Sequence, residues 1–148
     1  MPKQQTLEQA KRDLRQGKSP STAAGEFVKE EIEHVRQGKH GARSTKQAIA
    51  IGLSKARRAG IPLAAPKRGK TSQSTRRAAQ RDLEKGRGKR QAPSPERSRA
   101  ALHALEREPR QAASSAALSR QAKSVAARRR RARGTTTRTG SKRASRRA

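Results

Sequence analysis

Basic side chains are the residues of this sequence with the clearest chemical potential. The chain has 39 Lys and Arg residues against 11 Asp and Glu residues, which gives a net charge of +28 over 148 residues. An excess of this size attracts polyanions, and nucleic acids are the most abundant polyanions in cells. The composition therefore predicts that function begins with the binding of phosphate groups.

Two clusters of cations are the predicted nucleic-acid-binding residues. The first lies in and after the segment GKHGARSTK and consists of Lys39, Arg43, Lys46, Arg57 and Arg58. The second lies in the arginine-rich C-terminal region and consists of Arg128, Arg129, Arg130, Arg131 and Arg133. We expect Lys46, Arg57 and Arg58 to face outward from one helix and to form a phosphate-binding surface with the other two. The alternative for any one cation is a merely solvated charge.

No catalytic constellation is visible. Cysteine is absent, which excludes thiol nucleophiles, disulfides and Cys-based metal sites. The histidines, His34, His40 and His103, are not spaced as a metal set, so we expect free surface side chains. The adjacent Glu30 and Glu31 have no evident His or nucleophile partner and are predicted to lie on an exposed helix face. We therefore expect a protein that is not an enzyme and has no metal ion or cofactor.

Two glycine-containing motifs resemble phosphate-binding loops. GKHG at residues 38–41 matches the GXXG pattern of KH domains, but no strand is predicted nearby, which argues against that fold. GKT at residues 69–71 lacks the upstream Gly of a P-loop, because Ala64 stands at that position. The GKHG loop could still present its cations to a phosphate beside the N-terminus of the next helix, or it could be a solvated turn.

The elements that position these residues are predicted to be short helices with little apolar surface. Leu, Ile, Val and Phe supply sixteen of 148 residues, a fraction typical of chains that are largely disordered. The predicted fold class is mainly α with extensive disorder. It comprises a small αα-hairpin core, short basic helices and a disordered basic C-terminal tail.

Five regions are expected along the chain. They are an N-terminal basic helix at residues 1–20, the αα-hairpin core at 21–62, a linker at 63–74, weakly apolar basic helices at 75–131 and the disordered tail at 132–148. Start signals for the outer helices are Thr6, Thr75, Ser94 and Ser115, and the last helix is expected to end at about Arg131.

The first helix of the predicted core begins after Ser21 or Thr22 and ends at Gly38. Its apolar stripe consists of Val28, Ile32 and Val35, with Phe27 beside it. Glu26, Glu30 and Glu33 are expected on the opposite, exposed side. This arrangement would make the helix acidic on its outer face.

The second helix of the core begins at the N-cap Ser44 and ends at Gly60. Its small residues Ala48, Gly52 and Ala56 recur every four positions and would let the first helix approach closely. We expect only this pair of helices to have apolar stripes that face each other.

A weak internal repeat connects distant parts of the chain. AKRDLRQGK at residues 10–18 matches AQRDLEKGR at residues 79–87. Repeated structural units and independent use of favourable helix-end residues both explain such a match.

The scarcity of aromatic residues bears on the choice of partner. Phe27 is the one aromatic residue, so stacking on unpaired bases is not available, and duplex DNA is the expected partner, bound with little sequence preference. An RNA-associated or ribosome-associated protein is the first alternative. A module that recruits a protein, not identified from the sequence, through the acidic helix face is the second. The N-terminus has no apolar run and no segment has the length of a membrane span, so a cytoplasmic, nucleoid-associated location is expected.

The segment PSTAAGEFVKEEIEHVRQGKHGARSTKQAIAIGLSKARRAGI at residues 20–61 resembles the core of a family of small, basic, uncharacterised bacterial proteins that often carry a DNA-binding label. PKQQTLEQAK, SPERSRAALHALERE and ALSRQAKS also resemble segments of that family, so the resemblance covers most of the chain. It implies DNA binding but no established mechanism.

Overall fold

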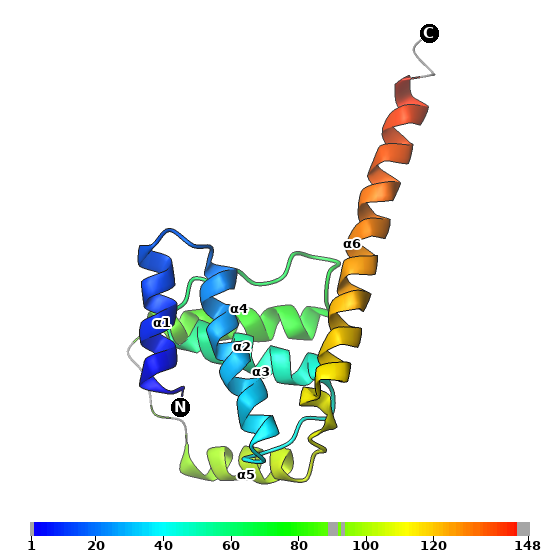
Figure 1. Cartoon of the computed structure of the whole chain (residues 1–148). Helices are drawn as coiled ribbons and strands as arrows, with labels where there is room; N and C mark the ends of the chain where they lie inside the picture. The colour runs from blue at the N-terminus through cyan, green and yellow to red at the C-terminus, as the bar shows by residue number, and fades with distance from the viewer. Residues whose placement is uncertain (1, 89–91, 93, 145–148) are drawn as a thin grey trace. The chain divides into compact units, whose positions relative to one another are not determined.

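The chain is mainly helical, as the sequence predicts. The computed structural model describes residues 2–88, 92 and 94–144, and it contains no strand in those residues. The helices are α1 (Gln4–Arg15), α2 (Pro20–Arg36), α3 (Thr45–Arg58), α4 (Gln73–Arg87), α5 (Pro95–Glu106), the short 3₁₀ helix η1 (Gln111–Ala113) and α6 (Ser115–Ala144) (Figure 1).

Two compact units make up the chain, one at residues 1–113 and the other at residues 114–148. The second unit is built on α6, whose backbone continues as a helix past the predicted end at about Arg131. Side chains are described only up to residue 133, and residues 145–148 of the predicted tail lie outside the described part. The five-region division and the disorder of the free tail remain predictions.

Several helix starts follow polar residues that cap them, with three differences from expectation. The Ser44 hydroxyl accepts a hydrogen bond from the Gln47 amide, which confirms the predicted cap of α3. Helix α2 begins earlier than predicted, because Ser19 is its cap and Pro20 occupies the first position. Thr6 is not the start signal of α1, which begins at Gln4 without a side-chain cap. Helix α4 begins at Gln73 with Ser72 as its cap, so the start predicted at Thr75 is also wrong.

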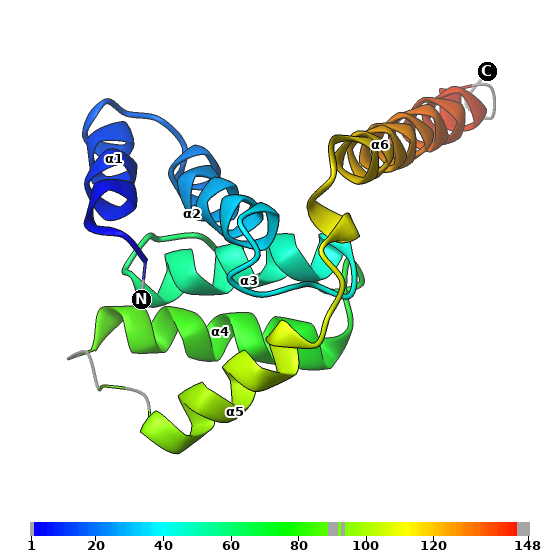
Figure 2. The same ribbon diagram turned by 60° about the horizontal axis from the view of Figure 1, so that its bottom comes forward.

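Helices α2 and α3 pack against each other through small residues, and α3 lies across α2 (Figure 2). Ala48, Gly52 and Ala56 are all buried. A Cβ atom at position 52 would lie 2.6 Å from the Cα of Val28, so the absence of a side chain is what lets the backbones meet. The predicted role of the small residues is confirmed. Whether residues 21–62 fold as an independent hairpin remains a prediction.

The substitution Gly52→Ala is expected to destabilise the first unit by about 1–3 kcal/mol, because the added methyl group forces the helices apart. Gly25→Ala is the matched control, since Gly25 is also helical but exposed, and a Cβ atom added there would have no other atom within 4 Å. The control should gain about 0.5–1 kcal/mol from helix propensity. Thermal unfolding followed by circular dichroism measures both, and a Tm rise in Gly52→Ala would contradict the close crossing.

The core extends beyond the two helices that the sequence predicts to face each other. One cluster gathers residues of α1, α2 and α3 with Ile61 and comprises Ala10, Ala23, Ala24, Phe27, Ala56 and Ile61. A second cluster brings η1 against α2 and α3 and comprises Val35, Ala42, Ala48, Ala112 and Ala113. The expectation that apolar stripes face each other only between residues 21 and 60 is therefore wrong.

Helices α1 and α4, which contain the repeated AxRDL segments, have similar packing roles. Ala10 and Asp13 are buried in α1, and Ala79 and Asp82 are buried in α4. Helix α1 packs on α2 and α4 packs on α3. The repeat therefore places a small residue and an acid at corresponding buried positions, which favours a shared packing role over helix-end chemistry alone.

Candidate functional site

The loop between α2 and α3 turns its backbone inward. Gly38 has a φ of 74°, a left-handed conformation that suits glycine. The amide of Gly41 donates to the Leu105 carbonyl at 2.8 Å, and the amide of Ala42 donates to the Pro109 carbonyl at 2.9 Å. Within GKHG, the amides of Gly38, Lys39 and Gly41 all donate to backbone carbonyls, so they are not open to a phosphate as in a KH-type clamp.

Three predicted phosphate contacts lie on the outer side of this region. Lys39 and Arg43 are exposed in the loop, and Lys46 is exposed in the first turn of α3. None of the three forms an ion pair with another residue in the described part of the chain. The first amides of α3 add a partial positive charge beside them. The loop and the start of α3 thus present cations that are available to an anionic partner.

The outward orientation predicted for Arg57 is wrong. Its side chain is buried, and its guanidinium donates to the carbonyls of Leu63 and Ala64 at 3.1 and 3.4 Å. Arg58 is exposed, but its Nε lies 2.7 Å from Asp82 Oδ1 on α4. Arg57 therefore fixes the chain that follows α3, and Arg58 is partly neutralised.

The second predicted cluster lies on α6. Arg128, Arg129, Arg130, Arg131 and Arg133 all have exposed side chains. Successive residues of a helix point in directions about 100° apart, so the consecutive arginines surround the helix instead of forming one face. Phosphates could therefore approach this part of α6 from several directions.

Burial separates the two signs of charge in the first unit. Its buried acids are Asp13, Glu30, Glu31 and Asp82, whereas the one buried Lys or Arg in the described residues is Arg57. Three of these acids pair with cations of the same unit, Asp13 with Lys18, Glu31 with Lys55 and Asp82 with Arg58. Exposed Lys and Arg side chains outside these pairs carry the excess positive charge.

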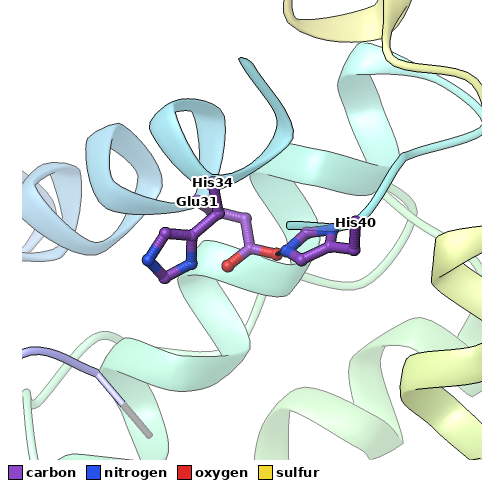
Figure 3. A group of neighbouring side chains, drawn as sticks. All are labelled: Glu31, His34 and His40. Carbon is purple, nitrogen blue, oxygen red and sulfur yellow. Dashed lines mark ion pairs between the residues drawn. The ribbon is translucent and has the colours of Figure 1, made fainter. Parts of the chain in front are cut away.

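Helix α2 and the following loop bring together a polar cluster of Glu31, His34 and His40. One potential ligand atom from each residue lies within 4.8 Å of those of the other two. Figure 3 shows the Glu31 carboxylate between the two imidazole rings. Glu31 is 1% exposed and His40 is 8% exposed. The expectations that Glu31 lies on an exposed face and that these histidines are free at the surface are wrong.

The two carboxylate oxygens of Glu31 have different surroundings. Oε2 forms an ion pair with Lys55 of α3. Oε1 lies 3.0 Å from His40 Nε2 but accepts no hydrogen bond. The 3.0 Å distance would suit an ion pair with a protonated His40. No hydrogen bond to Oε1 is formed, however, so we regard Oε1 as an unsatisfied buried acceptor.

The two histidines differ in what holds them. His40 Nδ1 lies 3.0 Å from the carbonyl oxygen of Gly41, and because a carbonyl only accepts, Nδ1 must be the donor. His34 Nε2 lies 3.5 Å from Glu30 Oε1. Burial and, less strongly, the charges of Lys55 and Lys39 lower the pKa of His34, which favours its neutral imidazole.

Two sequence signals could have revealed this cluster. Glu31 shares the face of Val28 and Val35 at helical spacing, so it belongs to the buried stripe. His34 follows Glu31 by three positions, which places both on one side of the helix. The position of His40 could not be inferred in this way, because it depends on the path of the loop after Gly38.

Comparisons of this chain with protein-family models, curated proteins and solved structures find no match. The resemblance to a bacterial family therefore rests on the segments quoted above. Among the described helices, none combines the length and apolar character needed to cross a membrane.

Proposed function

We propose that this chain is a non-enzymatic DNA-binding protein that neutralises the phosphates of duplex DNA with little sequence preference. The observation that carries the proposal is the accessibility of the cations, since Arg57 is the single buried Lys or Arg among the described residues. The side chains behind the net charge of +28 are therefore almost all open to an anionic partner in the described part of the chain. A bacterial, nucleoid-associated location is part of this proposal.

Duplex DNA is favoured over single strands by the position of the one aromatic residue. Phe27 is 1% exposed in the core between α1, α2 and α3, so it cannot stack on a base. Proteins that bind single strands commonly use exposed aromatic side chains for this purpose. Lys and Arg side chains contact the phosphates of any duplex, so a duplex RNA is the partner against which DNA must be compared.

The structure weakens the alternative of a protein-recruiting acidic face on α2. Glu30 is buried, and its Oε1 accepts a hydrogen bond from the Lys3 amide at 3.0 Å. Glu26 and Glu33 are only partly exposed. The expected exposed acidic stripe is therefore not present as predicted, and the alternative has lost its main support.

Fluorescence anisotropy with the full chain tests the proposed function. Labelled duplex DNA, duplex RNA and single-stranded DNA of one length are titrated at the same salt concentration, and two duplex DNA sequences are included. We expect the tightest binding to duplex DNA, similar affinity for both sequences and a steep decrease with salt. Preference for RNA or for single strands would contradict the proposal.

The exposed cations of the loop and α3 provide a residue-level test. Replacement of Lys39, Arg43 and Lys46 by Gln is expected to weaken duplex binding and to lower the log–log salt slope by up to about 2.7, because each phosphate contact contributes about 0.9. The three side chains are exposed, so the helical content measured by circular dichroism should not change.

A matched control removes the same charge elsewhere. Lys67, Arg68 and Lys70 are also exposed and lie between α3 and α4. Their replacement by Gln should have a smaller effect if the loop and the start of α3 form a true contact surface. Equal losses in both triple variants would show that net charge alone determines the affinity.

A further inference from the structure

We propose that Glu31, His34 and His40 form a binding site for one divalent transition-metal ion of the zinc type. The site lies between the C-terminal half of α2 and the loop that follows it (Figure 3). It is separate from the exposed cations assigned to DNA, and the inference does not depend on the proposed function.

The hydrogen bond of His40 leaves the correct nitrogen available for a metal ion. Since Nδ1 donates its proton to the Gly41 carbonyl, the neutral ring has its lone pair on Nε2. A backbone carbonyl that holds one ring nitrogen while the other binds metal is a common arrangement in metal sites. The Nε2 atom faces Glu31 Oε1 at 3.0 Å. At this separation two electron-rich atoms repel each other unless a proton or a metal ion lies between them.

The Glu31 carboxylate supplies a second, independent indication. Its Oε1 is buried without a hydrogen-bond donor, and such groups are rare in folded proteins because their desolvation is not compensated. Oε2 is already held by Lys55, which would orient the carboxylate and leave Oε1 free to bind the ion. Glu30 Oε2 is a further buried acceptor without a donor and adds negative charge near His34.

The donor set selects the class of metal. Two imidazole nitrogens and one carboxylate oxygen are ligands that zinc and neighbouring transition metals bind well. Mg²⁺ and Ca²⁺ prefer sites made of oxygen atoms and are therefore not expected to compete. Three protein ligands leave a coordination position for water on a tetrahedral ion. The ion would join α2 to the loop that carries Lys39 and Arg43.

Titration of the full chain with Co²⁺ and Zn²⁺ in the absence of nucleic acid tests the site. Bound Co²⁺ reports its ligands through visible absorption, and Zn²⁺ should displace it at one ion per chain. We expect Zn²⁺ to raise the Tm, because it binds only the folded arrangement, and Mg²⁺ at the same concentration to leave the Tm unchanged. Absence of saturable Co²⁺ absorption and of a Tm shift with Zn²⁺ would overturn the proposal and identify the cluster as a buried ion-pair network.

Three histidine variants complete the test, since the chain contains three histidines. His34→Gln and His40→Gln should each weaken Zn²⁺ binding at least tenfold. His103→Gln is the matched control, because the His103 side chain is 71% exposed on α5, and it should bind Zn²⁺ like the unaltered chain. If His40→Gln fails to fold, the partly exposed His34 still decides the question. Equal affinity in His34→Gln and His103→Gln would overturn the assignment of the site.

Discussion

Removal of residues 114–148 is expected to weaken duplex DNA binding by at least roughly 100-fold at moderate salt. The removed unit contains twelve of the 39 Lys and Arg residues and no Asp or Glu. Each lost phosphate contact should lower the log–log salt slope by about 0.9, so about six contacts would lower it by about 5. Anisotropy titrations of the shortened and full chains over a series of salt concentrations measure both quantities.

The control for this deletion keeps the length of the chain. Replacement of the arginine cluster of α6 by Gln, at positions 128, 129, 130, 131 and 133, retains the rest of the unit. The log–log salt slope of this variant should be lower than that of the full chain by up to about 4.5, while its helical content remains similar. If the deleted and full chains have the same slope, the phosphate contacts lie in residues 1–113 and the assignment of the α6 arginines is wrong.

The substitution Phe27→Ala is expected to have the largest effect on stability, a loss of about 3–5 kcal/mol. Phe27 is 1% exposed and is the largest side chain in the cluster that joins α1, α2 and α3. That cluster otherwise consists mainly of alanines, which cannot expand to fill the cavity. Since small domains are stable by only about 5–15 kcal/mol, this loss would remove a large part of the stability of the first unit and lower its Tm strongly. Thermal and urea unfolding measure the loss.

Leu102→Ala is the matched control for Phe27→Ala, because Leu102 is 45% exposed on α5 and its truncation should change the Tm little. DNA binding of the Phe27→Ala chain gives a second readout. If α6 supplies most phosphate contacts, the variant should retain much of its affinity although its first unit is destabilised. An unchanged Tm in Phe27→Ala would show that the described core does not hold the first unit together.

Helix existence and several helix ends could be predicted from the sequence because they depend on local chemistry. Ser44 caps α3 through the Gln47 amide, and Gly60 ends that helix with a φ of 91°. The close approach at Gly52 was also predictable, since small residues four positions apart form a groove on one helix. These features require only information from neighbouring positions along the chain.

Burial of the charged residues could not be predicted in the same way. A helical wheel assumes one buried face, but α2 is contacted by both α1 and α3, so its acidic side is not left to solvent. Glu31 pairs with Lys55, twenty-four positions away, and Asp82 pairs with Arg58 at the same separation. Such partners become neighbours only when the helices pack.

The positive charge, the lack of cysteine and the predominance of helix were determined by the sequence alone, because they follow from composition and local propensity. The tertiary structure decided which charges remain accessible. It buried Arg57 under the carbonyls of Leu63 and Ala64, left Lys39 exposed in the loop, and brought His40 to Glu31. The physical reason is that a buried charge needs a partner, and in this chain the partners come from segments that meet only in the folded protein.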